Sequence, residues 1–195
     1  MEFSDSCGLG YHSDIVAHFN FDPQIGFRMV ISGKLMDQFL KDFRHTVEQS
    51  STRLLQISAD QAAASEPGHW SSKEIVGHLI DSAANNHQRF VRAQFTDDLV
   101  LPGYEQDLWV TSQKYNEASW PELVHLWSAY NLHLSHVISV MPEEVLTRVR
   151  TEHNLDKIAW KAVPTTSPTT LEYFVRDYAG HMRHHLTQIL GENLE

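Results

Sequence analysis

Residues 169–191 read TTLEYFVRDYAGHMRHHLTQILG, a stretch with the periodicity of a helix that packs against a core. Its apolar side chains recur mostly at intervals of three or four residues: Leu171, Phe174, Val175, Tyr178, Met182, Leu186 and Ile189. This spacing places them on one face of an α-helix. Thr169 and Glu172 match the capping box that opens many helices, and Gly191 suits a helix end. The segment is therefore predicted to be an amphipathic helix.

Three segments upstream repeat this pattern, over residues 35–59, 71–95 and 119–141. Their apolar positions follow helical periods, and no stretch shows the alternation of a β-strand. Four amphipathic helices in one chain predict an all-α protein, an antiparallel four-helix bundle. The links after the second and third helices are long enough to allow a crossover connection.

Capping boxes mark the starts of the second and third helices. Ser71 precedes Glu74 by three residues, and Ser119 precedes Glu122 by the same spacing. In such a box the hydroxyl and the acidic side chain each accept a hydrogen bond from the other residue's backbone N–H. Pro121 lies in the first turn of the third helix, where a missing N–H costs no hydrogen bond.

The chain divides into two unequal parts. Residues 1–34 show no lasting period and are interpreted as an N-terminal extension, whereas residues 35–195 form the four-helix bundle domain. A chain of 195 residues is long enough for one domain with a substantial core. Cys7 is the only cysteine, which excludes an internal disulfide and fits a reducing compartment.

Composition excludes several classes of partner. The formal net charge is -10 at pH 7, from 15 Lys and Arg against 25 Asp and Glu, so the surface repels polyanions. No apolar run approaches the roughly 20 residues that span a bilayer. The start MEFSDSCGLG also lacks the basic and apolar regions of a secretory signal. We therefore expect a cytoplasmic protein that binds neither nucleic acid nor membrane.

The fourth helix carries a pair of histidines suited to one metal ion. His181 and His185 lie four residues apart, so their imidazoles are on the same face, one turn from each other. The residue after His181 is Met182, where the zinc-protease motif has a glutamate base. Proteolysis of that type is therefore disfavoured.

A polar stripe on the second helix completes the candidate site. Its members are spaced by three, four and four residues: His78, Asp81, Asn85 and Arg89. Burying such groups is costly unless they find partners, and a metal shared with the fourth helix would provide one. We therefore predict a divalent-metal site held by His78, His181 and His185. Three imidazoles leave an open position, at which an ion can activate water for hydrolysis or a thiol for transfer.

These motifs resemble a known family. The matching segments are WSSKE at 70–74, GHLIDS at 77–82 with Asn85 and Arg89, YEQDLW at 104–109 and GHMRHHL at 180–186. Together they are similar to the DinB-like superfamily, especially its YfiT-type branch of proteins assigned as metal-dependent hydrolases. The resemblance covers about residues 36–191 and leaves the N-terminal segment outside.

The resemblance implies a four-helix bundle, often a homodimer, with a zinc- or nickel-like ion. One histidine of the second helix and two of the fourth hold that ion in the family, and they correspond to His78, His181 and His185. Some relatives are thiol S-transferases that use low-molecular-weight thiols such as bacillithiol or mycothiol. Others are named hydrolases by inference, so the resemblance indicates the site more closely than the reaction.

Other polar residues have competing interpretations. Asp81 and Asn85 either orient ligands and water or bond to neighbouring side chains and helix ends. Arg89 either binds an anionic substrate group or, the favoured interpretation, forms a salt bridge. His184 points about 100° away from His185 on an ideal helix and is not counted as a ligand.

The leading hypothesis is a metal-dependent enzyme acting on a small molecule, with water or a small thiol as the activated group. The alternatives are a non-catalytic metal- or ligand-binding bundle with a structural or stress-related role, and a hydrogen-bond network without an ion. No residue at a fixed spacing identifies a general base. The tryptophans are interpreted as packing anchors, not pocket walls: Trp70, Trp109, Trp120, Trp127 and Trp160.

Overall fold

The computed structural model describes residues 23–191, with side chains described from residue 35 onward. Four long helices dominate: α1 (Pro23–Leu54), α3 (Ser72–Arg92), α5 (Trp120–Ser139) and α8 (Leu171–Leu190). The links contain short helices: α2 (Ala59–Ala63), α4 (Gln106–Gln113), the 3-10 turn η1 (Tyr115–Glu117), α6 (Glu143–Thr147) and α7 (Leu155–Ile158). Within residues 23–191 there are isolated β-bridges but no strand.

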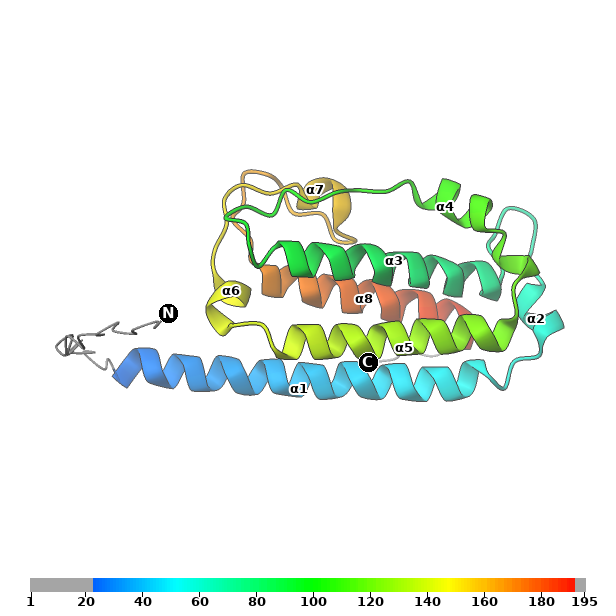
Figure 1. Cartoon of the computed structure of the whole chain (residues 1–195), viewed down its shortest axis with the longest axis horizontal. Coiled ribbons are helices and arrows are strands. Elements are labelled where there is room, and N and C mark those ends of the chain that lie inside the picture. The colour runs from blue at the N-terminus through cyan, green and yellow to red at the C-terminus, as the bar shows by residue number, and fades with distance from the viewer. Residues whose placement is uncertain (1–22, 192–195) are drawn as a thin grey trace, which may run out of the picture.

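The four long helices form one bundle in which α3 packs on α5 and α8, and α1 packs on the same two helices. Figure 1 shows α1 and α8 running in one direction and α3 and α5 in the other. The neighbours α1/α5 and α3/α8 are therefore antiparallel, whereas α3/α5 and α1/α8 are parallel. The link over residues 93–119 makes this possible, because it carries the chain back along the bundle. The predicted four-helix bundle with a crossover is confirmed.

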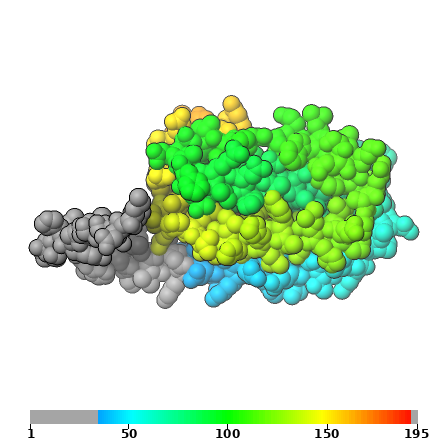
Figure 2. All heavy atoms as spheres, in the orientation of Figure 1, coloured from blue at the N-terminus to red at the C-terminus, as the bar shows by residue number. Residues whose placement is uncertain are grey.

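The space-filling view shows how much of the surface the crossover provides. In the orientation of Figure 2, the crossover link and α5 make up most of the visible surface. No helix in the described range 23–191 has the length and apolar character needed to cross a bilayer.

The first helix differs from its predicted bounds of 35–59. It begins at Pro23 and ends at Leu54, so its first turns lie in the segment assigned to the extension. Figure 1 shows these turns projecting beyond the rest of the bundle. The division at residue 34 stays a prediction, and Cys7 lies outside the described residues.

The end of the first helix was also predicted too late. A capping box at Ser58 opens a separate short helix, α2: Gln61 N–H donates to the Ser58 hydroxyl, and Ser58 N–H donates to the Gln61 side chain. A new helix start requires extended backbone at its N-cap. The continuous helix therefore stops before this residue.

The two predicted capping boxes upstream of the fourth helix have different outcomes. Ser71 forms its box: Glu74 N–H donates to the hydroxyl at 3.2 Å, and Ser71 N–H donates to the Glu74 carboxylate at 2.8 Å. Ser119 makes no such bond, so the box expected there is wrong. The start of α5 is held instead by the Trp120 indole, which donates to the carbonyl of Leu54 at 3.0 Å.

The predicted cap of the fourth helix is wrong by one residue. Thr170 is the N-cap, and its hydroxyl accepts the Tyr173 N–H at 3.1 Å. Thr169 is unavailable because its backbone pairs with that of Arg150, with N···O distances of 2.8 and 2.9 Å in the two directions. A pairing with a distant segment thus displaces the helix start.

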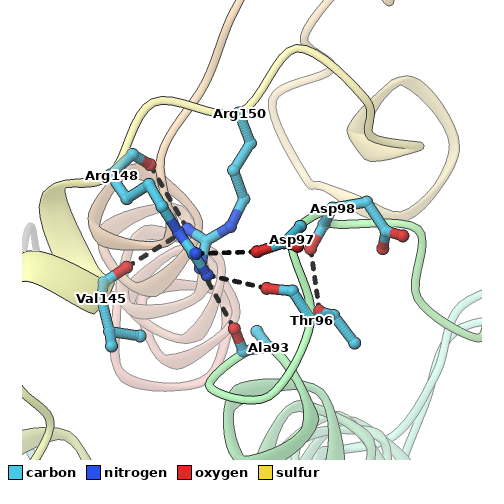
Figure 3. Close-up of polar contacts among 7 residues, drawn as sticks. All are labelled: Ala93, Thr96, Asp97, Asp98, Val145, Arg148 and Arg150. Atoms are coloured by element: carbon cyan, nitrogen blue, oxygen red, sulfur yellow. Dashed lines mark hydrogen bonds and ion pairs between the residues drawn. The ribbon is translucent and has the colours of Figure 1, made fainter.

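The end of α3 is tied to the last link by two arginines (Figure 3). Arg150 is buried and donates to the carbonyls of Ala93, Val145 and Arg148 at 3.1–3.3 Å. Arg148 pairs with the Asp97 carboxylate at 2.9 Å. A cation at a helix C-terminus is favourable because the last carbonyls carry partial negative charge. These contacts fix the link that leads to α8.

Candidate metal centre

The three predicted histidines meet between α3 and α8. The Nε2 atom of His181 lies 3.2 Å from Nε2 of His78 and 3.1 Å from Nε2 of His185. One ring nitrogen from each residue lies within 4.8 Å of the other two. The antiparallel packing of α3 on α8 therefore assembles this three-histidine group from positions more than 100 residues apart in the chain.

Burial keeps the three rings neutral. It lowers the pKa of His78 to about 4, and His185 contributes in the same direction. Burial also lowers the pKa of His181 to about 3 and, less strongly, the pKa of His185. All three imidazoles are therefore uncharged at neutral pH. This is the form that binds divalent transition metals.

The geometry of the three nitrogens fits a shared cation. A neutral ring nitrogen carries either one proton or one lone pair, so Nε2 of His181 cannot bond optimally to both neighbours. An ion between the rings would accept all three lone pairs. For tetrahedral bonds of about 2.0–2.1 Å, ligand nitrogens are roughly 3.3 Å apart. The two observed distances, 3.1 and 3.2 Å, are close to this spacing.

A hydrogen bond orients His185. Its Nδ1 atom lies 2.8 Å from Oε1 of Gln188, which can only accept. Nδ1 therefore carries the proton, and Nε2 keeps its lone pair directed at His181. His184 lies outside the three-histidine group and is exposed, as expected from its position on the helix.

Two tryptophans contact the histidines, although all five were interpreted as packing anchors. The ring centroid of Trp70 lies 5.1 Å from that of His78. Trp160 lies 6.4 Å from His181 and 5.4 Å from His184. These rings form walls beside the imidazoles. Their distances in sequence from the histidines gave no indication of this contact.

Asp81 and Asn85 bond to their neighbours. The Asp81 carboxylate accepts hydrogen bonds from the Tyr115 hydroxyl at 2.7 Å and from Gln113 at 2.8 Å. Burial raises the pKa of Asp81, and these two hydrogen bonds oppose the shift. Asn85 donates to the backbone carbonyl of Asp81 at 2.9 Å. Among the described residues neither side chain bonds to a histidine: Asp81 joins α3 to the crossover link, whereas Asn85 bonds within α3.

A cavity of about 770 Å³ opens beside the three-histidine group. It lies between α3, α8 and the two links, with His78 and His181 in its wall. The α3 residues that line it are spaced by four, four and three: His78, Ser82, Asn86 and Arg89. The predicted stripe ran through positions 81 and 85. Positions 81 and 82 lie on either side of the direction of His78, so only the packing of α8 decides between them.

The favoured interpretation of Arg89 is wrong. Within residues 35–191 it forms no salt bridge, and its guanidinium donates to the carbonyl of Pro102 and to the side chain of Asn86. The cavity is also lined by residues that the motifs did not single out, including Trp160 and Asp177.

The fold and the three-histidine group define a class of helical proteins with a candidate metal centre between two helices of a bundle. The family model of the DinB superfamily matches residues 38–189, and the chain belongs to this superfamily. The resemblance drawn from the paired motifs is thereby confirmed.

Curated relatives that are 22% identical to this chain share one name. Proteins from Bacillus cereus strain B4264 and Bacillus anthracis strain CDC 684, provisionally named metal-dependent hydrolases, are 22% identical over 169 residues. The match covers 85% of this chain and 90% of each relative. A solved structure of YfiT from Bacillus subtilis is described as a probable metal-dependent hydrolase with an unusual four-helix bundle topology. It aligns with a TM-score of 0.65 at 16% identity, over 80% of this chain and 84% of that one, which supports the fold.

Proposed function

We propose that this chain is a metal-dependent enzyme that acts on a small molecule bound in the cavity. A divalent ion would be held by His78, His181 and His185. The observation that carries the proposal is the pair of short Nε2–Nε2 distances from His181 to His78 and to His185. This pair suits one ion, and it leaves Nε2 of His181 unable to bond optimally to both neighbours.

The chemistry follows from three neutral ligands and an open cavity. An ion with three imidazole ligands and an open position supplies Lewis acidity, which activates water or a thiol. The protein contributes neutral rings, aromatic side chains beside them, and a cavity whose size suits a small molecule. Hydrolysis is supported by the names of the relatives, and thiol S-transfer by the wider family resemblance.

Zinc and nickel are the ions we propose, because imidazole suits both and selection depends on availability. A low-molecular-weight thiol is proposed as the co-substrate if the reaction is a transfer. A homodimer stays a prediction, which light scattering of the purified protein would test. A cytoplasmic location and the absence of nucleic-acid partners also stay predictions.

The test is metal content per chain, measured by elemental mass spectrometry on protein purified without a histidine tag. We expect about one equivalent in the wild type, loss in His181→Ala, and no change in His133→Ala, which removes an exposed histidine elsewhere. Absence of metal in the wild type after reconstitution would contradict the proposal. Metal without turnover on hydrolytic and thiol panels would favour the non-catalytic alternative.

A further inference from the structure

Arg89 lies at the opposite end of the cavity face of α3 from His78. The two positions are eleven residues apart, about three turns, so they point the same way roughly 16 Å apart along the helix. Ser82 and Asn86 occupy the turns between them. The cavity therefore has a guanidinium at one end and the three-histidine group at the other.

The Arg89 guanidinium has donors to spare. Of its five N–H groups, Nε and one on Nη2 donate to the Pro102 carbonyl at 2.9 and 2.8 Å. One on Nη1 donates to the side chain of Asn86 at 3.3 Å. The remaining two N–H groups have no acceptor within residues 35–191. A ligand in the cavity could accept both.

Within the part of the chain whose side chains are described, the positive charge of Arg89 is also uncompensated. Its residue is only 4% exposed, yet no carboxylate of the described residues lies within 4.0 Å of it. Asp177 lines the same cavity, but its two oxygens accept the backbone N–H groups of Trp160 and Lys161 at 2.8 Å. Buried charges are normally paired, and the described residues supply no anion for this one.

Aromatic rings flank the guanidinium. The Arg89 Cζ atom lies 5.8 Å from the ring centre of Tyr104 and 5.9 Å from that of Phe174. Tyr178 and Trp160 extend this apolar wall toward the histidines. A ligand that pairs with Arg89 therefore has aromatic rings beside it.

We propose that the cavity binds a small carboxylate, whose anionic group pairs with Arg89 and whose apolar body lies against these rings. The far end of the molecule is then directed toward His78 and His181. This assignment of substrate class rests on the proposed function only for the reaction at that far end. Binding of the carboxylate itself requires no metal.

The experiment compares 3-phenylpropionate with its neutral amide, 3-phenylpropionamide, by isothermal titration calorimetry on the full chain. A charge-assisted pair in a buried site predicts that the wild type binds the carboxylate about tenfold or more tightly than the amide. Arg89→Gln removes this preference and leaves amide binding unchanged. Arg89→Lys retains part of it, and also serves if the glutamine variant fails to fold.

Two further variants serve as controls. Arg92→Gln removes the same charge from the last turn of α3 at an exposed position outside the cavity, and keeps the preference. Lys157→Gln removes an exposed cation that lines the cavity, and this variant should also keep the preference for the carboxylate. No carboxylate binding by the wild type, equal affinities for the two probes, a preference that survives Arg89→Gln, or loss in Lys157→Gln would overturn the assignment.

Metal content measured on the same samples separates this proposal from the proposed function. An Arg89-dependent preference in protein that takes up no metal supports the carboxylate site and contradicts the metal enzyme. Metal uptake without the preference contradicts the carboxylate site alone.

Discussion

Two groups of histidines extend from α3, and their surroundings differ. The three-histidine group joins His78 to the pair on α8. A second group, here called the surface group, joins His87 to His133 and His136 on α5, with ring centroids 5.0 and 6.4 Å apart along that order. The ring centroids of His78 and His181 are 5.1 Å apart, so the rings lie about as close together in both groups.

The direction of the nitrogens separates the two groups. In the three-histidine group the Nε2 atoms converge at 3.1 and 3.2 Å, and His78 is 1% exposed. In the surface group His133 and His136 are exposed, and no hydrogen bond of the described residues joins their ring nitrogens. Closely spaced rings alone therefore do not define a metal site. A candidate metal site requires ring nitrogens that converge in a buried place.

The largest expected effect is on stability when metal is removed. A ligand at 100 times its dissociation constant adds about 2.7 kcal/mol to the free energy of unfolding. Chelation should therefore lower the melting temperature of the wild type and of His133→Ala, whereas His181→Ala should be insensitive. Differential scanning calorimetry measures the melting temperature with and without chelator. An equal change in the two variants would show that the three-histidine group is no more a metal site than the surface group.

The next effect is a loss of stability of the metal-free protein in acid. The pKa of His78 is about 4 in the folded chain against 6.5 for an ordinary histidine, so below pH 6.5 the unfolded chain binds a proton that the folded chain does not. Stability is therefore complete above pH 6.5 and falls toward pH 4, by about 1 kcal/mol per pH unit for this group.

Urea unfolding at several pH values checks the slope. His78→Phe should reduce it, because an uncharged ring replaces the titrating one, and His133→Ala serves as the control. A slope that is the same in His78→Phe and the wild type would show that burial of the imidazole does not govern the acid response.

A smaller effect concerns the support of the three-histidine group. A Cβ on Gly77 would overlap the ring of Tyr115, which is buried and hydrogen-bonded to Asp81. A Cβ on Gly180 would approach Trp160 at 3.0 Å, but that side chain is exposed and free to shift. Gly77→Ala should therefore cost about 1–3 kcal/mol of unfolding free energy, and Gly180→Ala less than half as much. Similar losses in urea titrations would contradict this ranking.

The smallest expected effect is on metal affinity through Gln188. Removing a group that orients a ligand weakens metal binding about tenfold, or about 1.4 kcal/mol. Gln188→Ala should show this in competition with a chromophoric chelator. Gln188→Glu keeps an acceptor for Nδ1 of His185 and should retain the affinity. If Gln188→Ala binds as tightly as the wild type, the hydrogen bond does not orient the ring.

Local patterns predicted the helices and the His181 and His185 pair because both depend on neighbours along one helix, whereas joining His78 to that pair relied on the polar stripe of the second helix and on the family resemblance. The capping box at Ser71 and the spacing of His181 and His185 are of this kind. The box expected at Thr169 failed because its backbone pairs with Arg150, a partner that no local pattern reveals. Similarly, no sequence spacing indicates that Trp160 contacts His181 or that Arg89 has no carboxylate partner within residues 35–191.

The amino-acid sequence by itself determined that four amphipathic helices form and that two of them present histidines toward the core, since helical period and apolar burial need no further information. The tertiary structure alone decided which polar residues of α3 face the cavity. On an ideal helix Asp81 and Ser82 lie within about 60° of His78 on opposite sides. The packing angle of α8 and the course of the crossover place Ser82 and Asn86 in the cavity wall and turn Asp81 toward Tyr115.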